Sequence, residues 1–207
     1  MAKLWSSSVT QDVSATRAFF GPRAAGWEDR FPADGPAYVR AVTELGPAPG
    51  GVVVDVGCGT GRALSPLRAA VGQDGLVIGV DLTVEMLAEA RRHGRGAIAA
   101  LVLGDGGRLP LRAGRADAVF AAGLLPHLAD PAGGLAELAR AVRPGGRLAL
   151  FHPISRAALA ARHRGVASDD ATLSPRRLPA LLAASGWSVV SIDDGPDRYL
   201  ALAVRAS

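Results

Sequence analysis

The residues best placed to bind a ligand are three glycines that follow a short apolar stretch. The stretch from Val52 to Val56 leads directly into Gly57, Gly59 and Gly61. Glycine at alternate positions lets the main chain turn sharply and approach a ligand with no side chain in between. A dinucleotide fingerprint would need a further glycine where this chain has Arg62. The spacing therefore predicts a nucleotide-sized site of another kind, at the carboxyl end of the first strand.

Aspartates stand near the ends of the first three apolar stretches. We expect Asp55 to brace the glycine turn by accepting backbone N–H groups, which also shapes the ligand site. Asp81 lies about 20 residues past the glycines, a place that suits hydrogen bonds to ribose hydroxyls. Thr83 can take the helix N-cap position and leave Asp81 free for the ligand. Asp105 with Gly106 predicts either an adenine contact or an ordinary Asp-Gly turn.

Three apolar or weakly polar residues complete the predicted ligand site. Cys58 lies inside the glycine loop and is the only cysteine, which excludes an internal disulfide and a multi-cysteine zinc site. Leu82 and Met86 follow Asp81 and are expected to line a slot for the adenine, although Met86 also suits the core of a helix.

The elements that must position these residues alternate in the way typical of a doubly wound α/β fold. We expect strands at 52–56, 76–81, 97–103, 116–122, 147–152, 187–193 and 199–204. We expect helices at 12–20, 36–45, 62–71, 84–93, 131–142 and 175–185. In such a sheet, ligands lie beyond the carboxyl ends of the strands, where the strand order reverses.

The composition suits one globular domain without a nucleic-acid partner. Of 207 residues, 49% are hydrophobic and 20% charged, so the chain can bury a full core. Residues 1–45 hold six of the ten aromatic side chains and are predicted to form a helical lid on a core at 46–207. The net charge is only +4, and apart from Lys3 the basic residues are scattered arginines. We find neither a signal peptide nor a membrane-length apolar run, and expect a cytoplasmic protein.

The glycine spacing resembles motif I of the class I methyltransferases that depend on S-adenosylmethionine (SAM). Later segments resemble further motifs of that family, and 124–131 followed by 135–146 is similar to its ubiquinone/menaquinone-biosynthesis branch, which methylates small molecules. The resemblance covers about residues 50–152. It implies a Rossmann-like sheet of seven strands, six parallel and the last antiparallel. It also implies that the glycine loop, Asp81 on the ribose, and Asp105 with Gly106 on the adenine bind SAM and the product S-adenosylhomocysteine (SAH).

Other branches and cofactors fit the sequence less well. Residues 121–125 lack the Asn/Asp-Pro-Pro-Tyr-like turn of enzymes that methylate amino groups of DNA bases, and no lysine follows Lys3 for a ribose 2′-O-methyltransferase. The absence of a Tyr-x-x-x-Lys pair argues against a short-chain dehydrogenase. No cluster of acids or histidines has the spacing of metal ligands, so we expect no metal.

The acceptor side of the predicted site rests on fewer residues. His127 follows the fourth strand and His152 ends the fifth, so either can remove a proton from an acceptor hydroxyl. Alternatively, His127 braces its loop and His152 makes a cap-like contact before a proline. Phe20 and Trp27 are predicted to cover the acceptor. The function we predict is methyl transfer to a small molecule by in-line displacement, in a monomer or homodimer; the alternative is a non-catalytic SAM or SAH binder.

Overall fold

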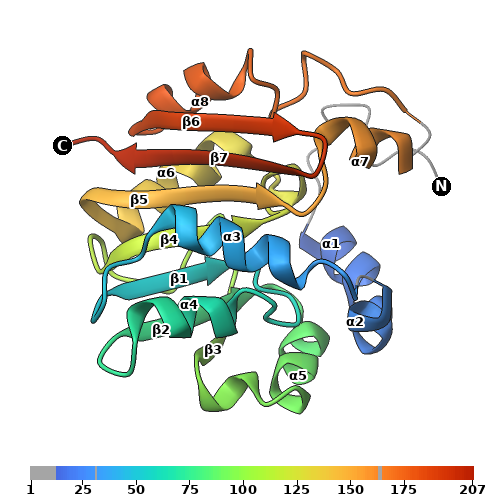
Figure 1. Cartoon of the computed structure of the whole chain (residues 1–207), viewed down its shortest axis with the longest axis vertical. Helices are drawn as coiled ribbons and strands as arrows, with labels where there is room; N and C mark the ends of the chain where they lie inside the picture. The colour runs from blue at the N-terminus through green and yellow to red at the C-terminus, as the bar shows by residue number, and fades with distance from the viewer. Residues whose placement is uncertain (1–12, 31, 163–164) are drawn as a thin grey trace.

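A computed structural model describes residues 13–30, 32–162 and 165–207. Within these ranges the chain forms a seven-stranded sheet with helices on both faces (Figure 1). The spatial order of the strands is β3-β2-β1-β4-β5-β7-β6. Their bounds are β1 Val52–Val56, β2 Leu76–Asp81, β3 Ala100–Leu103, β4 Ala116–Ala122, β5 Val142–His152, β6 Trp187–Gly195 and β7 Arg198–Arg205.

The strand directions confirm the predicted Rossmann-like topology. β1 pairs in parallel with both β2 and β4, and the parallel pairing continues to β3 on one side and β5 on the other. β7 lies antiparallel between β5 and β6. Six strands therefore point one way, and the strand order reverses between β1 and β4. That reversal opens a crevice at the carboxyl end of β1.

Helices cover both faces of the sheet. α3 (Gly35–Leu45) and α4 (Leu64–Val71) pack on one face, and α6 (Pro131–Ala141) and α8 (Leu178–Ala184) on the other. Figure 1 shows α1 (Val13–Phe20), α2 (Trp27–Arg30) and α7 (Arg156–Arg162) beyond the arrowheads of the parallel strands. The remaining helices are η1 (Gly21–Gly26), α5 (Val84–Arg92), η2 (Arg95–Ala97) and η3 (Leu125–His127).

Alternation along the strands separates two hydrophobic clusters, because successive side chains point to opposite faces. Phe120 and Phe151 face α3 and α4, with ring centroids 5.5 Å apart. Trp187 faces α6, is 1% exposed, and donates a hydrogen bond from Nε1 to Leu135 O over 2.9 Å. The apolar surface of Trp187 is therefore buried in the core, and its one polar side-chain atom has a hydrogen-bond partner there.

Two predicted elements begin three residues later than the sequence suggests. The strand predicted at 97–103 begins at Ala100, because Gly94 adopts a left-handed conformation (φ 73°) and starts the 3-10 turn η2. The helix predicted at 175–185 begins at Leu178, because the hydroxyl of Ser174 accepts the Arg177 N–H and forms a turn first. The helix α7 (Arg156–Arg162) lies where we predicted no element.

Candidate functional site

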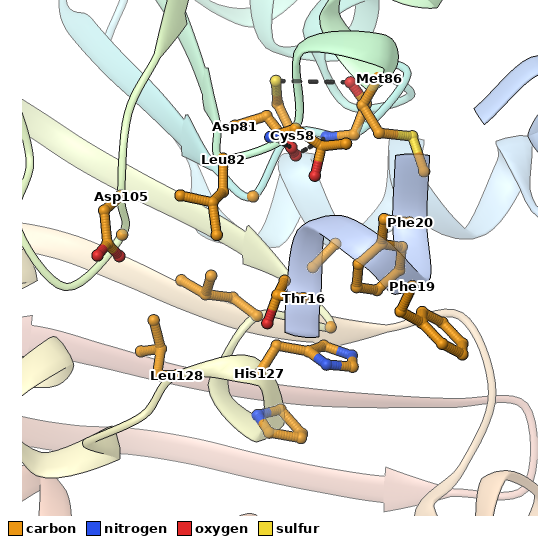
Figure 2. A pocket seen from close by; sticks show the side chains of 18 of the residues that line it. Thr16, Phe19, Phe20, Cys58, Asp81, Leu82, Met86, Asp105, His127 and Leu128 are labelled. Atoms are coloured by element: carbon orange, nitrogen blue, oxygen red, sulfur yellow. Dashed lines mark hydrogen bonds between the residues drawn. The ribbon is translucent and has the colours of Figure 1, made fainter. Parts of the chain in front are cut away.

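A cavity of about 1070 Å³ lies at the carboxyl ends of the parallel strands. Its walls include the glycine loop after β1, the loops that follow β2, β3 and β4, the end of β5, and residues of α1 and α2 (Figure 2). Ligand pockets usually measure about 300–1,000 Å³, so this one is large enough for a cofactor and a second small molecule.

The glycine loop has the backbone geometry that its residues allow. The φ angles of Gly57, Gly59 and Gly61 are 72°, 55° and 87°, a left-handed region that other residues rarely adopt. A Cβ atom on Gly61 would lie 2.6 Å from Leu64 Cδ1. The N–H of Gly57 donates to Val80 O over 2.8 Å, which holds the loop against β2.

Asp81 braces the glycine loop. Its Oδ2 accepts the Gly59 N–H over 2.7 Å, and its Oδ1 accepts the Thr83 N–H over 2.8 Å. Thr83 occupies the N-cap position of α5 as predicted, but it does not leave the Asp81 carboxylate free. Burial raises the pKa of Asp81, and these hydrogen bonds only partly oppose it. An ionised carboxylate has about four acceptor positions, so Asp81 can still accept from a ligand.

Asp55 does not brace the loop, and that prediction was wrong. Its side chain is 1% exposed, and Oδ1 has no hydrogen-bond partner among the described residues. Burial, together with the nearby charge of Asp81, raises the pKa of Asp55 to about 8. The reason for the exchanged roles is positional: the backbone N–H groups of the loop point to β2, whose end carries Asp81. Asp55 lines the cavity instead, as a buried acid whose carboxyl group can accept a hydrogen bond from a ligand.

Asp105 forms the turn that was one of its two predicted roles. Its Oδ1 accepts the Gly107 N–H over 2.8 Å, and both residues line the cavity. A Cβ on Gly106 would lie 3.1 Å from Val56 Cγ1, so the chain runs close to the end of β1 there. Leu82 and Met86 line the same cavity, and so does Cys58, a buried thiol whose pKa is raised by burial.

Both predicted histidines line the cavity. The ring of His127 packs edge-to-face on Phe20, with centroids 5.0 Å apart, and Phe20 packs on Trp27 at 5.6 Å. His152 Nδ1 lies 3.2 Å from both N and O of Ile154, which fixes the orientation of the imidazole. A backbone contact of the kind considered for His152 is therefore present.

An ionic cluster that no sequence motif predicts surrounds Glu28. The Oε1 atom of Glu28 in α2 accepts from the Thr60 hydroxyl over 2.5 Å and from Arg95 Nη1 over 2.8 Å. Its Oε2 lies 3.3 Å from Arg62 Nη2, and Arg62 also contacts Asp34 at 3.4 Å. Burial alone would raise the pKa of Glu28, but the bonds from Arg95 and Thr60 bring it below its ordinary value. The cluster joins α2 to the glycine loop and to η2.

Within the described ranges, no three His, Cys, Asp or Glu side chains gather as they would around a metal ion. Among the same residues, no helix has both the length and the apolarity to cross a membrane.

Comparison with known proteins decides the family. The family described as methyltransferase domain matches residues 54–150. A demethylmenaquinone methyltransferase from Roseiflexus sp. (strain RS-1) is 31% identical over 166 residues, which cover 68% of this chain and 69% of that protein. This chain belongs to the SAM-dependent methyltransferases.

Other relatives of this methyltransferase match over shorter shares of their length. Nocamycin O-methyltransferase from Saccharothrix syringae is 38% identical over 126 residues, covering 58% of this chain and 44% of that one. The chain spans about a third to just over half of the length of most curated relatives it matches. The solved structure of magnesium protoporphyrin IX methyltransferase from Synechocystis PCC 6803 with bound SAH has the same fold, with a TM-score of 0.73, 20% identity, and coverage of 94% and 100%.

The cavity fits the cofactor of the family. SAM carries an ammonium group, a ribose and an adenine. The cavity offers a carboxyl oxygen of Asp55 that is buried and has no partner among the described residues, a main-chain cradle at the three glycines of the loop, and a braced carboxylate at Asp81. SAM is the cofactor of this methyltransferase.

Proposed function

We propose that this chain transfers the methyl group of SAM to a small, largely apolar acceptor that carries a hydroxyl group. The observation that supports this most strongly is the arrangement of the cavity, in which two histidines share one space with the glycine loop. Bound SAM supplies a methyl group on a positively charged sulfur, so the chain has to align the acceptor, exclude water and remove a proton.

The proposed cofactor contacts follow the polar groups of the cavity. The loop from Gly57 to Gly61, with Cys58, cradles the cofactor along its main chain. Asp81 accepts from the ribose hydroxyls with the lone pairs that Gly59 and Thr83 leave open.

Further proposed contacts lie at the two ends of the cofactor. Asp105 and Gly106 contact the adenine edge, and Leu82 and Met86 flank its faces. Asp55 accepts from the ammonium group, which would satisfy its unpartnered oxygen.

The proposed acceptor subsite combines the aromatic residues of the N-terminal segment with the two histidines. Phe20 and Trp27 line the cavity and contact each other, and Phe20 contacts His127. A flat, apolar acceptor suits such a wall. Two relatives, nocamycin O-methyltransferase and demethylmenaquinone methyltransferase, carry names that agree with a small-molecule acceptor.

A histidine in this place has one chemical task. The imidazole accepts the proton of the acceptor hydroxyl while that oxygen forms its bond to the methyl carbon and the bond from sulfur to carbon breaks. Proton removal by a positioned base contributes about 10²- to 10⁴-fold to a rate. His152, oriented through Nδ1 by the backbone of Ile154, and His127, held against Phe20, are the two candidates.

The test is an acceptor screen with methyl-labelled SAM. Purified protein would be incubated with phenols, naphthols and naphthohydroquinones, and both SAH release and labelled product would be measured. Product formed by the wild type and lost in one of the variants His127→Asn or His152→Asn supports the proposal. Tight SAH binding without any methyl transfer across the three classes would overturn it and favour the non-catalytic SAM binder.

A further inference from the structure

Helix α1 forms one wall of the cavity. Arg17 Nε donates to Leu82 O over 3.1 Å, and this bond ties α1 to the residue that follows β2. At the last residue of the helix, Phe20 packs on His127. Figure 2 shows α1 passing across the pocket, with Thr16 between Leu82 and His127.

The buried residue of α1 is a threonine where an amphipathic helix usually buries an apolar side chain. Thr16 is the one buried residue of this helix, and its exposed fraction is 8%. Its Oγ1 has no hydrogen-bond partner in the described part of the chain, and the residue lines the cavity. A buried hydroxyl without a partner costs free energy, so a bound molecule that supplies the partner would gain that free energy back.

The position of α1 indicates which part of the cofactor can supply a hydrogen-bond partner for the Thr16 hydroxyl. The Arg17 contact brings α1 to Leu82, on the side of the cavity formed by the ends of β2 and β3, and Thr16 is the neighbour of Arg17 in this helix. Asp81 and Asp105 close that side, whereas His152 and α7 lie beyond it, past β4. The adenosine part of the cofactor carries hydroxyl groups and ring nitrogens, and a threonine hydroxyl can donate to them or accept from them.

We propose that the Thr16 hydroxyl hydrogen-bonds the adenosine moiety of SAM, which makes α1 a cofactor-binding element. The inference rests on SAM as the cofactor and is independent of which acceptor is methylated. Nothing in the glycine motif or in the acids after β2 and β3 requires it, because Thr16 precedes β1 by more than thirty residues in the chain.

The experiment compares Thr16→Val with Thr16→Ser. Valine has the shape of threonine without the hydroxyl, and serine keeps the hydroxyl. Calorimetric titrations would use SAH and methylthioadenosine, which has the adenosine but no amino-acid group. We expect Thr16→Val to weaken both ligands by about three- to tenfold, and Thr16→Ser to stay within about twofold of the wild type. Thr43→Val is the control, because the Thr43 hydroxyl donates to Val39 O on the exposed side of α3.

Each other outcome overturns a defined part of the inference. Unchanged affinity of Thr16→Val for both ligands would show that the hydroxyl does not contact the cofactor. Weaker binding of SAH with unchanged binding of methylthioadenosine would show that the hydroxyl contacts the amino-acid part of the cofactor and not the adenosine. A wild type that binds neither ligand would overturn the cofactor itself. The thermal unfolding of ligand-free Thr16→Val should occur at or above the wild-type temperature; a clear fall would show that the hydroxyl has a structural partner.

Discussion

The carboxylate of Glu28 accepts a hydrogen bond from the hydroxyl of Thr60, and so connects the N-terminal segment to the middle of the glycine loop. The same carboxylate binds Arg95, whose guanidinium also donates to Thr60 O. The loop is thus held from two directions, by Asp81 from the sheet and by Glu28 from α2.

Replacing Glu28 with glutamine should loosen this connection. The variant leaves Arg62 and Arg95 without their shared carboxylate, and side chains only 11% and 17% exposed cannot be fully hydrated. We expect the free energy of unfolding to fall by about 1–3 kcal/mol and SAH to dissociate faster. Urea unfolding and stopped-flow displacement would measure the two effects. Glu44→Gln is the matched control, since Glu44 is itself 41% exposed and its partner Arg198 keeps Asp193 as a second carboxylate; equal effects from both variants would refute a specific role for Glu28.

Binding of SAH should release a proton at neutral pH. Burial and Asp81 raise the pKa of Asp55 to about 8, so the ligand-free protein holds this carboxyl protonated at pH 7, and an ammonium group bound to it favours the ionised form. Calorimetry at pH 7 in buffers of different ionisation enthalpy should show release approaching one proton. Asp55→Asn should abolish the release and weaken SAH roughly tenfold. Proton release that persists in the variant would have to come from another group.

The same carboxyl makes the stability of the ligand-free protein depend on pH. The folded state binds a proton at Asp55 up to about pH 8, whereas the unfolded state loses it near pH 4. Between these values the folded state holds more protons, so raising the pH lowers the free energy of unfolding, and the contribution is complete below pH 4. Urea titrations from pH 5 to 8 should show a slope that Asp55→Asn removes. A wild-type curve with no difference from the variant would contradict the assigned pKa.

Alanine at Gly61 should damage the loop more than alanine at another left-handed glycine. Gly50 and Gly61 have φ angles of 74° and 87°, so both substitutions carry the left-handed penalty of about 1–2 kcal/mol. Only at Gly61 does the new methyl group meet Leu64 at 2.6 Å and Arg95 at 2.9 Å, while nothing lies within 4 Å at Gly50. We expect Gly61→Ala to lose about 1–3 kcal/mol more and most SAH affinity. Equal losses would indicate that Leu64 and Arg95 move aside without cost.

The catalytic histidine should be separable from the positioning one by kinetics. The variant that removes the base should lower kcat about 10²- to 10⁴-fold with little change in KM. Loss of a residue that only shapes the cavity should mainly raise KM. Steady-state kinetics of His127→Asn and His152→Asn with one active acceptor would decide, and a kcat retained by both variants would exclude histidine as the base.

The sequence predicts the fold well because its signals are local. The valines of β1 and the glycines after it define a strand and a turn wherever the rest of the chain lies. β3 begins at Ala100 and not at residue 97 because a 3-10 turn comes first, which the residues there permit but do not require. Local propensity and apolar pattern do not distinguish a short 3-10 turn from the first residues of a strand.

The contacts within the site are harder to predict because they depend on distant residues. Asp55 and Asp81 are both acids at strand ends, and only the pairing of β1 with β2 determines which one meets the Gly59 N–H. Glu28 lies in Trp-Glu-Asp-Arg, a stretch without a motif, and it meets Thr60 and Arg95 only after folding. Thr16 also lies in a stretch without a motif, and only the folded chain places it in the cavity wall. Sequence patterns name the groups available for chemistry, and tertiary structure selects among them.

The two described tryptophans give this protein an optical property. Trp187 is enclosed in the core with its indole N–H on Leu135 O, and Trp27 stands in the cavity wall against Phe20. The emission of Trp187 therefore serves as an internal reference, whereas that of Trp27 senses whatever fills the cavity. With Trp5 changed to phenylalanine, the remaining fluorescence reports whether the cavity is occupied. Small-molecule libraries can then be screened for binding without a fluorescent label and without any assay of turnover.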